Sequence, residues 1–474
     1  MEKVDADSRW VRQDSVRTFT TGAVGYQLYA PDSGLIRYLN ETASFVWQLL
    51  DGAHTVGDAA RELVSEFEGC TLEDALPDVG ELIATLGAEG LARRLEGAGV
   101  TARPVWPCSD VSDGPNEWDV SLTGKCNLSC SYCFYANEMV GRSDLPTEGW
   151  RRFFEALGKL PTQKVCLSGG EVFVRPDLWD LVDSVVANGL RYSILSNGTL
   201  IREDTVAKLC EPSRRRRLNS IQVSIDGSCA EVHDASRGKG SFGRALRGLR
   251  LLMSAGLPVT VRLTVNRYNV EDLDAAAKLL LEDLGLPSFS TNDAMPMGAG
   301  CSNRGDITLS HQQQVEAMNS LQRLAEKYNG RVTASAGPLA KARFHAEMER
   351  ARATGEPIAL RRTGTLTACG CIFNKLAINH DGSITPCPIL ATVVLGHVDQ
   401  DAIQTIWKDD PTLKRMRSRH SIAMSDLPEC QGCDWTDLCN GSCPGLAYEQ
   451  FGDVNRANLN DCYRRFLEAS KHGN

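Results

Sequence analysis

Three cysteines stand close together between Cys126 and Cys133, separated first by three residues and then by two. Three thiolates on one short loop can hold three irons of a cubane 4Fe-4S cluster, which leaves the fourth iron for a ligand that is not protein. An iron with an open position implies chemistry and not electron storage alone. The alternatives are a zinc knuckle that lacks its fourth ligand and three unrelated thiols. This spacing constrains the chain most, because its fold has to gather these thiols around one cluster.

Length and composition indicate a multidomain protein. The 474 residues and 42% apolar content suffice for two to four domains with well-buried cores. The first residues contain no signal-like apolar stretch, and no run of eighteen apolar residues occurs anywhere. We therefore expect a cytoplasmic protein without a membrane partner. In that reducing compartment the 17 cysteines should not form disulfides, and their dense clusters favour metal binding.

Residues 1–97 are predicted to form a domain of their own. They carry 17 acidic and 8 basic side chains, which accounts for the whole net charge of -9. Short strands are expected at 16–23, 26–30 and 34–40. Helices with N-cap signals at Asn40, Thr55 and Thr71 should follow and end near residues 50, 67 and 90. Three strands and three helices predict a winged helix-turn-helix.

Such a domain can read DNA or bind a peptide. DNA reading requires a basic face, which this acidic segment lacks, so no nucleic-acid partner is expected. The run from Leu39 to Ala43, the segment Trp47 to Gly52 and the pair Gly90-Leu91 resemble the precursor-peptide recognition element of the pyrroloquinoline-quinone chaperone type. That resemblance implies binding of the leader of a ribosomally made peptide by strand addition.

Residues 98–116 are predicted to be a linker, and residues 117–300 an open, partial (β/α)6 TIM-like barrel. The expected strands are 118–123, 164–168, 192–196, 221–226, 259–266 and 289–294. On the fourth and fifth of them polar and apolar residues alternate, which predicts a polar interior able to hold a polar ligand. The overall fold class is thus α/β.

The cysteine loop, followed by Phe134 and Tyr135, resembles the signature loop of radical S-adenosylmethionine (SAM) enzymes. In that family the open iron binds SAM, and a Gly-Gly-Glu loop after the second strand lies at the SAM amino group; here Ser168-Gly169-Gly170-Glu171 has that place. The resemblance implies a set of SAM-binding candidates: Tyr132, Ser168, Gly169, Gly170, Glu171, Asn197, Ser224, Asp226 and Arg262. Arg262 would pair with the SAM carboxylate.

Residues 301–368 are expected to be bridging helices, with one from Ser310 to Gly330 and another from Pro338 to near Gly355. The four arginines 214–217 are interpreted as a solvated turn before the fourth strand.

Residues 369–474 resemble the SPASM extension of radical SAM enzymes that act on peptides, through eight cysteines in a characteristic order. The resemblance implies two auxiliary 4Fe-4S clusters, which makes three with the cluster at Cys126, Cys130 and Cys133. One auxiliary cluster would be held by Cys369, Cys371, Cys387 and Cys443, and the other by Cys430, Cys433, Cys439 and Cys462. The close Cys369-Gly370-Cys371 pair departs from the usual spacing, so one of these two thiols need not be a ligand.

These resemblances imply a peptide-modifying oxidoreductase. A flavodoxin or ferredoxin would reduce the first cluster, and SAM cleavage would yield a 5'-deoxyadenosyl radical that abstracts hydrogen from the core of a precursor peptide. We expect a thioether cross-link first and a carbon-carbon bond second. Asp226, Asp293 and Cys301 are the candidates for acid-base or thiol roles.

Three alternatives remain: a maturase of the formylglycine type, a quinone-cofactor maturase that joins Glu to Tyr, and a non-enzymatic iron-sulfur regulator that binds DNA.

Overall fold

The computed structural model describes residues 4–20, 25–67, 69–95, 114–358, 363–366 and 372–472. The chain divides into two compact units, Met1–Asn116 and Glu117–Asn474. Most of the predicted linker lies outside the described residues. None of the helices in the described ranges combines the length and apolar character needed to cross a bilayer.

The first unit contains two small antiparallel sheets and a group of helices. One sheet has the order β5-β1-β6 and the other β2-β3-β4. The elements are β1 (Arg9–Arg12), β2 (Arg17–Thr20), β3 (Tyr26–Ala30), β4 (Leu35–Leu39), α1 (Glu41–Leu49), β5 (Asp51–Thr55), α2 (Val56–Glu66), α3 (Leu72–Ala88) and β6 (Ala92–Arg94). Strands β2 to β4 and all three helices lie where the sequence predicts them. The sheet β5-β1-β6 was not predicted, and the winged helix-turn-helix arrangement stays a prediction.

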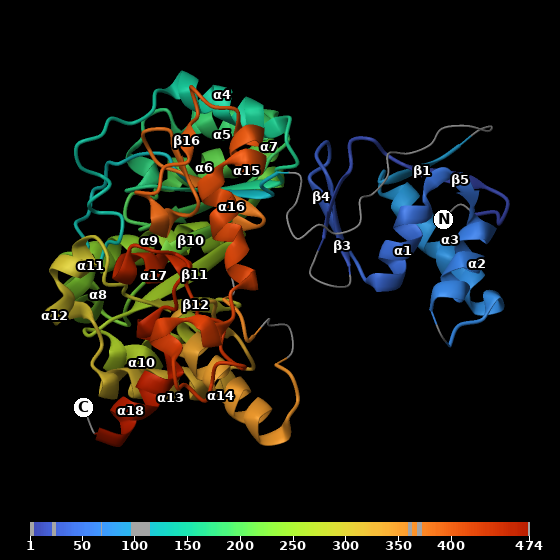
Figure 1. Ribbon diagram of the computed structural model, residues 1–474. Helices are drawn as coiled ribbons and strands as arrows, with labels where there is room; N and C mark the ends of the chain where they lie inside the picture. The colour runs from blue at the N-terminus through green and yellow to red at the C-terminus, as the bar shows by residue number, and fades with distance from the viewer. Residues whose placement is uncertain are drawn as a thin grey trace. The chain divides into compact units, whose positions relative to one another are not determined.

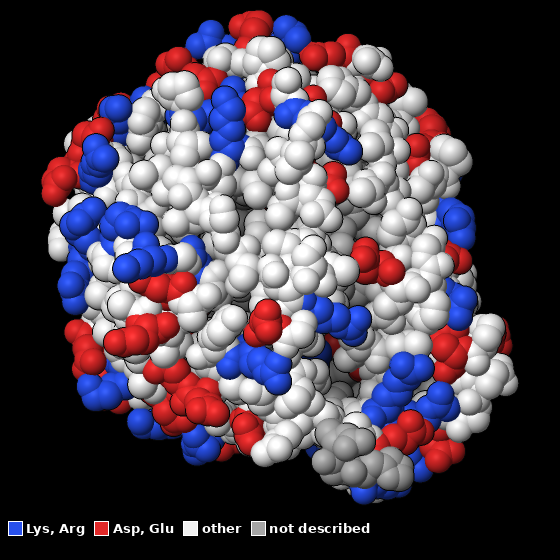
Figure 2. Space-filling model, turned by 90° about the vertical axis from the view of Figure 1, so that its left-hand side faces the viewer, with Lys and Arg blue, Asp and Glu red and all other residues white. Residues whose placement is uncertain are grey.

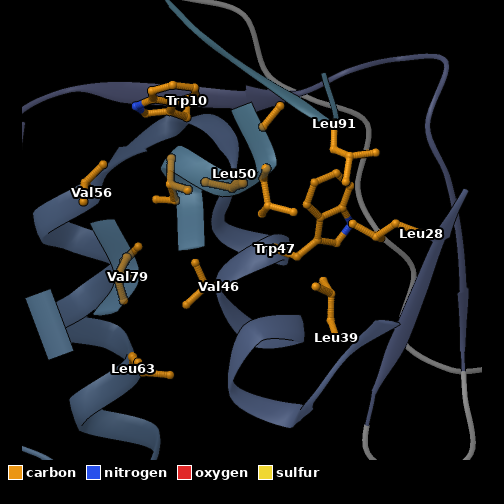
Figure 3. Close-up of a cluster of buried hydrophobic side chains, with 14 of the residues drawn as sticks. Trp10, Leu28, Leu39, Val46, Trp47, Leu50, Val56, Leu63, Val79 and Leu91 are labelled. Atoms are coloured by element: carbon orange, nitrogen blue, oxygen red, sulfur yellow. The ribbon is translucent and has the colours of Figure 1, made fainter. Parts of the chain in front are cut away.

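Side-chain caps start these helices. The Asn40 carboxamide oxygen accepts from Ala43 N at 2.9 Å, and Thr55 and Asp58 form a reciprocal capping box. Trp47, fully buried, belongs to the core and lies beside Leu28, Leu39 and Leu91 (Figure 3). Burial of these apolar faces, more than helix propensity, stabilises the unit.

In the second unit, ten strands of the described residues form one sheet with the order β13-β12-β11-β10-β9-β8-β7-β14-β15-β16. Strands β10, β11 and β12 of this sheet lie side by side in Figure 1. Its strands are β7 (Glu117–Ser121), β8 (Lys164–Ser168), β9 (Arg191–Ser196), β10 (Leu218–Ser224), β11 (Val259–Val265), β12 (Phe289–Asp293), β13 (Val332–Ala334), β14 (Lys375–Ile378), β15 (Ser383–Thr385) and β16 (Gly396–His397). Neighbours from β13 to β14 are parallel, and the β14-β15-β16 part is antiparallel. All six predicted barrel strands are present in sequence order, so the α/β partial barrel is confirmed.

Helices connect these strands. They are α4 (Thr147–Gly158), α5 (Leu178–Ala187), α6 (Glu203–Leu209), α7 (Pro212–Arg217), α8 (Ala230–Arg237), α9 (Ser241–Ser254), α10 (Leu273–Lys278), α11 (Ala299–Ser302), α12 (Arg304–Ile307), α13 (His311–Lys327), α14 (Gly337–Thr354), α15 (Ile403–Asp409), α16 (Pro411–Arg417), α17 (Pro444–Phe451) and α18 (Tyr463–His472). Helices α13 and α14 match the two predicted bridging helices.

On the face drawn in Figure 2, acidic and basic side chains are interspersed around a largely uncharged middle.

The interpretation of residues 214–217 as a solvated turn is wrong. They belong to α7, and Arg214 and Arg217 are buried. The Arg214 guanidinium binds both carboxylate oxygens of Asp183 at 2.7 Å. A run of charges can therefore be partly internal when one face of a short helix finds a carboxylate partner.

Candidate active site

The three cysteines of the signature loop lie beyond the carboxyl end of β7. Leu122 N donates to Ser168 O at 2.9 Å, so the loop begins beside the end of β8. Burial raises the pKa of all three thiols, to about 11 for Cys133, and Cys130 raises those of Cys126 and Cys133 further. Thiols that raise one another's pKa values lie close together. Their protons would be displaced when iron binds.

Two other segments hold this loop from outside. Ser131 N donates to Ser236 O of α8 at 2.9 Å, while Asn303 Nδ2 donates to Ser131 O at 2.9 Å. Ala299 N, at the start of α11, donates to Cys133 O at 2.9 Å. The loop is thus fixed by hydrogen bonds that span more than a hundred residues, and no local pattern could have predicted them.

The two glycines after β8 permit close packing against the cysteine loop. Gly169 has φ +137°, and a Cβ at Gly170 would lie 2.2 Å from Lys125 O. Gly170 N donates to Thr123 O at 2.7 Å, and Glu171 N donates to Lys125 O at 2.9 Å. Only residues without a side chain fit this approach. Contact of these glycines with a SAM amino group stays a prediction.

The Glu171 carboxylate is fully buried and joins the ends of β8 and β9. It accepts from Ser196 Oγ and from Asn197 N, both at 2.8 Å, and burial raises its pKa despite these hydrogen bonds. Asn197 Nδ2 in turn donates to Asn127 Oδ1 at 2.9 Å, and Ser168 Oγ donates to Val120 O at 3.2 Å. These predicted SAM-binding side chains are therefore engaged in holding the loops together.

Arg262 on β11 lies next to Ser224 of β10 in the sheet register. Its Nε is buried and has no hydrogen-bond partner in the part of the chain that the structure describes, and burial lowers the pKa of the guanidinium. A buried cationic group in this state is stabilised by an anionic ligand. A cluster with bound SAM fits this site, which combines an Arg262 Nε without a partner among the described residues, closely packed glycines and three adjacent thiols.

Asp226, just beyond β10, is fully buried. It accepts from Arg237 Nε at 2.5 Å, from Thr264 N at 2.8 Å and from the Tyr132 hydroxyl. An acid-base role for Asp226 would require these contacts to break. Arg237 itself was missed by sequence reasoning, because it ends a helix far from the loop in sequence.

The other two acid-base or thiol candidates are Asp293 and Cys301. Asp293, at the end of β12, is 3.3 Å from Lys341 Nζ, and that ammonium group is 2.7 Å from Asp461. Cys301 is exposed on α11. Roles for these residues in the reaction stay predictions.

The C-terminal cysteines fall into two regions of the structure. Burial and the neighbouring Cys439, Cys462 and Cys433 raise the pKa of Cys430 to about 12. Ligation of one cluster by these four thiols stays a prediction. Cys387 and Cys443 precede two short helical segments, and a Cβ on Gly445 would contact both Ile389 and Cys443. Cys369 and Cys371 lie outside the described residues.

Among the described residues, no three Cys, His, Asp or Glu side chains lie close enough to share one metal ion. The thiolates of a cubane instead bind separate irons.

Three family models match the chain. The radical SAM superfamily matches residues 120–280, coenzyme PQQ synthesis protein D (PqqD) matches 25–92, and the iron-sulfur cluster-binding SPASM domain matches 369–434.

Two kinds of curated relative have similar sequences. The AdoMet-dependent heme synthase of Methanosarcina barkeri is 26% identical over 70% of this chain and 92% of its own length. The mycofactocin maturase MftC of Mycobacterium tuberculosis is 29% identical over 68% of this chain and 76% of its own length.

Two solved structures share the fold. Streptococcus suis SuiB, bound to the precursor peptide SuiA, has a TM-score of 0.63 at 14% identity and covers 96% of this chain and 100% of its own. The enzyme anSMEcpe with bound AdoMet has a TM-score of 0.55 at 17% identity and covers 75% of this chain and 97% of its own. At these identities the likeness establishes the fold.

Proposed function

We propose that this chain, a radical SAM enzyme that also carries a PqqD-like domain and a SPASM iron-sulfur domain, binds the leader of a ribosomally synthesised peptide and cross-links its core. A thioether is the first choice of bond, and a carbon-carbon bond is the second. A flavodoxin- or ferredoxin-type protein would supply electrons.

The observation that carries this proposal is the presence of a PqqD-like unit and a radical SAM-SPASM unit in one chain. In the first unit β2 and β4 are the outer strands of their sheet, so either could pair with an extended peptide. Tyr38 on β4 is 68% exposed and available to contact such a peptide. The fold shared with SuiB, whose structure contains a precursor peptide, supports the same use.

The relatives named heme synthase and Fe-coproporphyrin III synthase favour a second candidate, a porphyrin substrate. A unit that matches PqqD has no evident use in binding a flat macrocycle, whereas an outer strand suits an extended chain. We therefore favour the peptide and keep the porphyrin as an outcome of the test.

The residues of the chain would contribute binding, orientation and exclusion of water. Cys126, Cys130 and Cys133 would hold the first cluster, and Arg262 would bind the SAM carboxylate. SAM bound at the reduced first cluster would supply the chemistry of hydrogen-atom abstraction from the peptide. The auxiliary clusters would accept the electron released as the cross-link closes. Glu171 and its partners would keep the surrounding loops in place.

The proposal is tested with peptides encoded by short reading frames beside this gene. The anaerobically reconstituted enzyme, dithionite and SAM are incubated with each peptide, with and without its leader, and the products are sequenced by mass spectrometry. We expect the mass of the leader-containing peptide to fall by two hydrogen atoms. The new bond should survive reduction, and a thiol that has become a thioether should no longer be alkylated.

Other products would identify the alternatives. An aldehyde would indicate the formylglycine type, a Glu-Tyr bond the quinone-cofactor type, and conversion of a porphyrin an activity of the heme-synthase type. Salt-sensitive binding of duplex DNA without SAM turnover would revive the regulator. Any of these in place of a cross-linked peptide would overturn the proposal.

A further inference from the structure

A basic stretch of the barrel has no acidic neighbours in the sequence. Between Asp234 and Glu271 the chain has six arginines, one lysine and no aspartate or glutamate. The whole chain has a net charge of -9, so this stretch departs from the rest of the protein. Its first part forms the end of α8, the turn at 238–240 and helix α9. The function proposed above uses none of its exposed cations.

Lys239, Arg244 and Arg247 of this stretch, together with Arg202, form a surface that we call the basic patch. Lys239, Arg247 and Arg202 are exposed, and Arg244 is half-buried. No ion pair joins any of them to a carboxylate in the part of the chain that the structure describes. Their charges therefore face solvent and add to one positive field.

Three of these cations lie at the start of α9. A Cβ added at Gly240 would lie 3.1 Å from Arg244 Nη1, so this guanidinium lies against the turn that carries Lys239. Arg247 is three residues further along the helix, and residues at that spacing are neighbours on its surface. The nearest carboxylate in the sequence, Asp234, accepts hydrogen bonds from backbone N–H groups at the beginning of α9.

Arg202 joins the patch from the segment after β9. A Cβ on Gly248 of α9 would lie 3.1 Å from Ile201 Cβ, so the residue before Arg202 packs directly on this helix. Two exposed carboxylates, Glu203 and Asp204, follow in the first turn of α6. The cations of the patch outnumber these carboxylates, so the surface stays positive.

Hydrogen bonds join both segments of the patch to the cysteine loop. Ser131 N donates to Ser236 O at 2.9 Å, and Asn127 Nδ2 donates to Thr199 Oγ1 at 2.8 Å. On each segment an exposed cation follows three residues after this hydrogen bond, and three residues span at most about 11 Å. Cys130 lies between the two attached loop residues in the sequence, so the patch is close to the site of the first cluster.

We propose that the basic patch is the docking surface for an acidic one-electron carrier that reduces the first cluster. Electron tunnelling weakens steeply with distance, so a carrier has to dock near the cluster, and opposite charges speed and orient the encounter. In this step the carrier loses one electron and the cluster gains it, while no bond forms or breaks. The inference rests on the electron donor of the proposed function and is independent of the peptide.

The test compares two reductants of the reconstituted full-length protein in the absence of peptide. One is an acidic flavodoxin kept reduced by its reductase and NADPH, and the other is dithionite, a small molecule that needs no docking surface. Lys239→Glu with Arg247→Glu reverses two exposed charges of the patch. We expect the flavodoxin concentration for half-maximal formation of 5'-deoxyadenosine to rise by about tenfold or more. The rate with dithionite should stay unchanged.

Arg216→Glu with Arg350→Glu is the matched control, because it changes the net charge equally. Both arginines are exposed on helices and form no ion pair with a described carboxylate. Arg216 precedes β10, at the end of the parallel strands opposite to the cysteine loop, and Arg350 lies on α14, which packs beside β12 and β13. The control should keep the flavodoxin dependence of the unaltered protein.

Binding is measured separately by isothermal titration calorimetry with oxidised flavodoxin. The unaltered protein and the control should bind it at low salt, and the affinity should fall as added salt screens the exposed charges. The patch variant should bind at least about tenfold more weakly. Equal binding and equal flavodoxin dependence in the patch and control variants would overturn the proposal.

Two other results would also contradict it. One is a protein that dithionite activates but that neither flavodoxin nor ferredoxin reduces. The other is binding of RNA or duplex DNA that the patch variant loses while its flavodoxin-driven rate is unchanged. A peptide left unmodified would contradict only the proposed cross-linking, since nucleoside formation is measured here without peptide.

Discussion

Replacement of Gly170 by alanine should damage the site through one methyl group. A Cβ there would lie 2.2 Å from Lys125 O and 2.5 Å from Lys125 C, distances that no real side chain tolerates. Both contacted atoms are backbone, so no rotamer change can relieve the overlap, and the cysteine loop or the loop after β8 has to move.

The expected loss of stability is calculated from the hydrogen bonds that this movement breaks and from the cost of overpacking. Gly170 N and Glu171 N donate two hydrogen bonds to the cysteine loop, at 2.7 and 2.9 Å, and each contributes about 1 kcal/mol. Overpacking adds about 1–3 kcal/mol. We expect the free energy of unfolding to fall by about 3–5 kcal/mol.

Two assays measure this effect anaerobically: urea unfolding of the iron-free chain, and iron content after reconstitution. Gly170→Ala should unfold at a lower urea concentration and retain less iron. The control is Gly243→Ala on α9, where a Cβ would meet no atom within 4 Å. That change should stabilise the protein by about 0.5–1 kcal/mol. Equal stability and iron content in the two variants would refute the steric reasoning.

Three further predictions concern other parts of the chain. Thr55→Ala removes a capping box and should destabilise the first unit by about 1 kcal/mol, measured by thermal unfolding. Burial, and then Lys341, lower the pKa of His345 to about 4. Because the unfolded chain takes up this proton first, stability should fall by about 3 kcal/mol as the pH falls from about 6.5 to about 4. His345→Phe should flatten that part of the pH profile. Lys341→Met leaves Asp293 and Asp461 without their shared cation and should destabilise the protein by about 3–5 kcal/mol, measured by urea unfolding.

The sequence predicted the elements whose signals are local. Six barrel strands were recognisable because buried strands alternate or form apolar runs between glycines and prolines. Helix starts were recognisable because Asn40, Thr55 and Thr71 are capping residues that act within three or four positions.

Elements formed by distant pairing were missed. Strand β5 has the sequence Asp-Gly-Ala-His-Thr, which is typical of a turn, and it becomes a strand only because β1 pairs with it. The extension of the barrel sheet by β14 likewise depends on pairing with β7, more than 250 residues away in the chain.

The candidate site likewise combines residues that local sequence signals predict with contacts between distant segments that they do not. Cysteine spacing and the Gly-Gly-Glu loop are local and were recognised. The contacts of Arg237 and Asn303 with the cysteine loop join segments that are distant in sequence, so only the fold reveals them. The side chain of Glu171 illustrates a third case, since its position was predicted but its burial against Ser196 and Asn197 was not.

The central claim is that Cys126, Cys130 and Cys133 hold a cluster that acts on SAM. The most direct measurement is formation of 5'-deoxyadenosine by the reconstituted, dithionite-reduced protein and by the variant with alanine at all three positions. We predict nucleoside from the unaltered protein only, with about four irons fewer per chain in the variant. Bound zinc in place of iron, nucleoside formation by the variant, or no nucleoside from a fully loaded and reduced protein would contradict the claim.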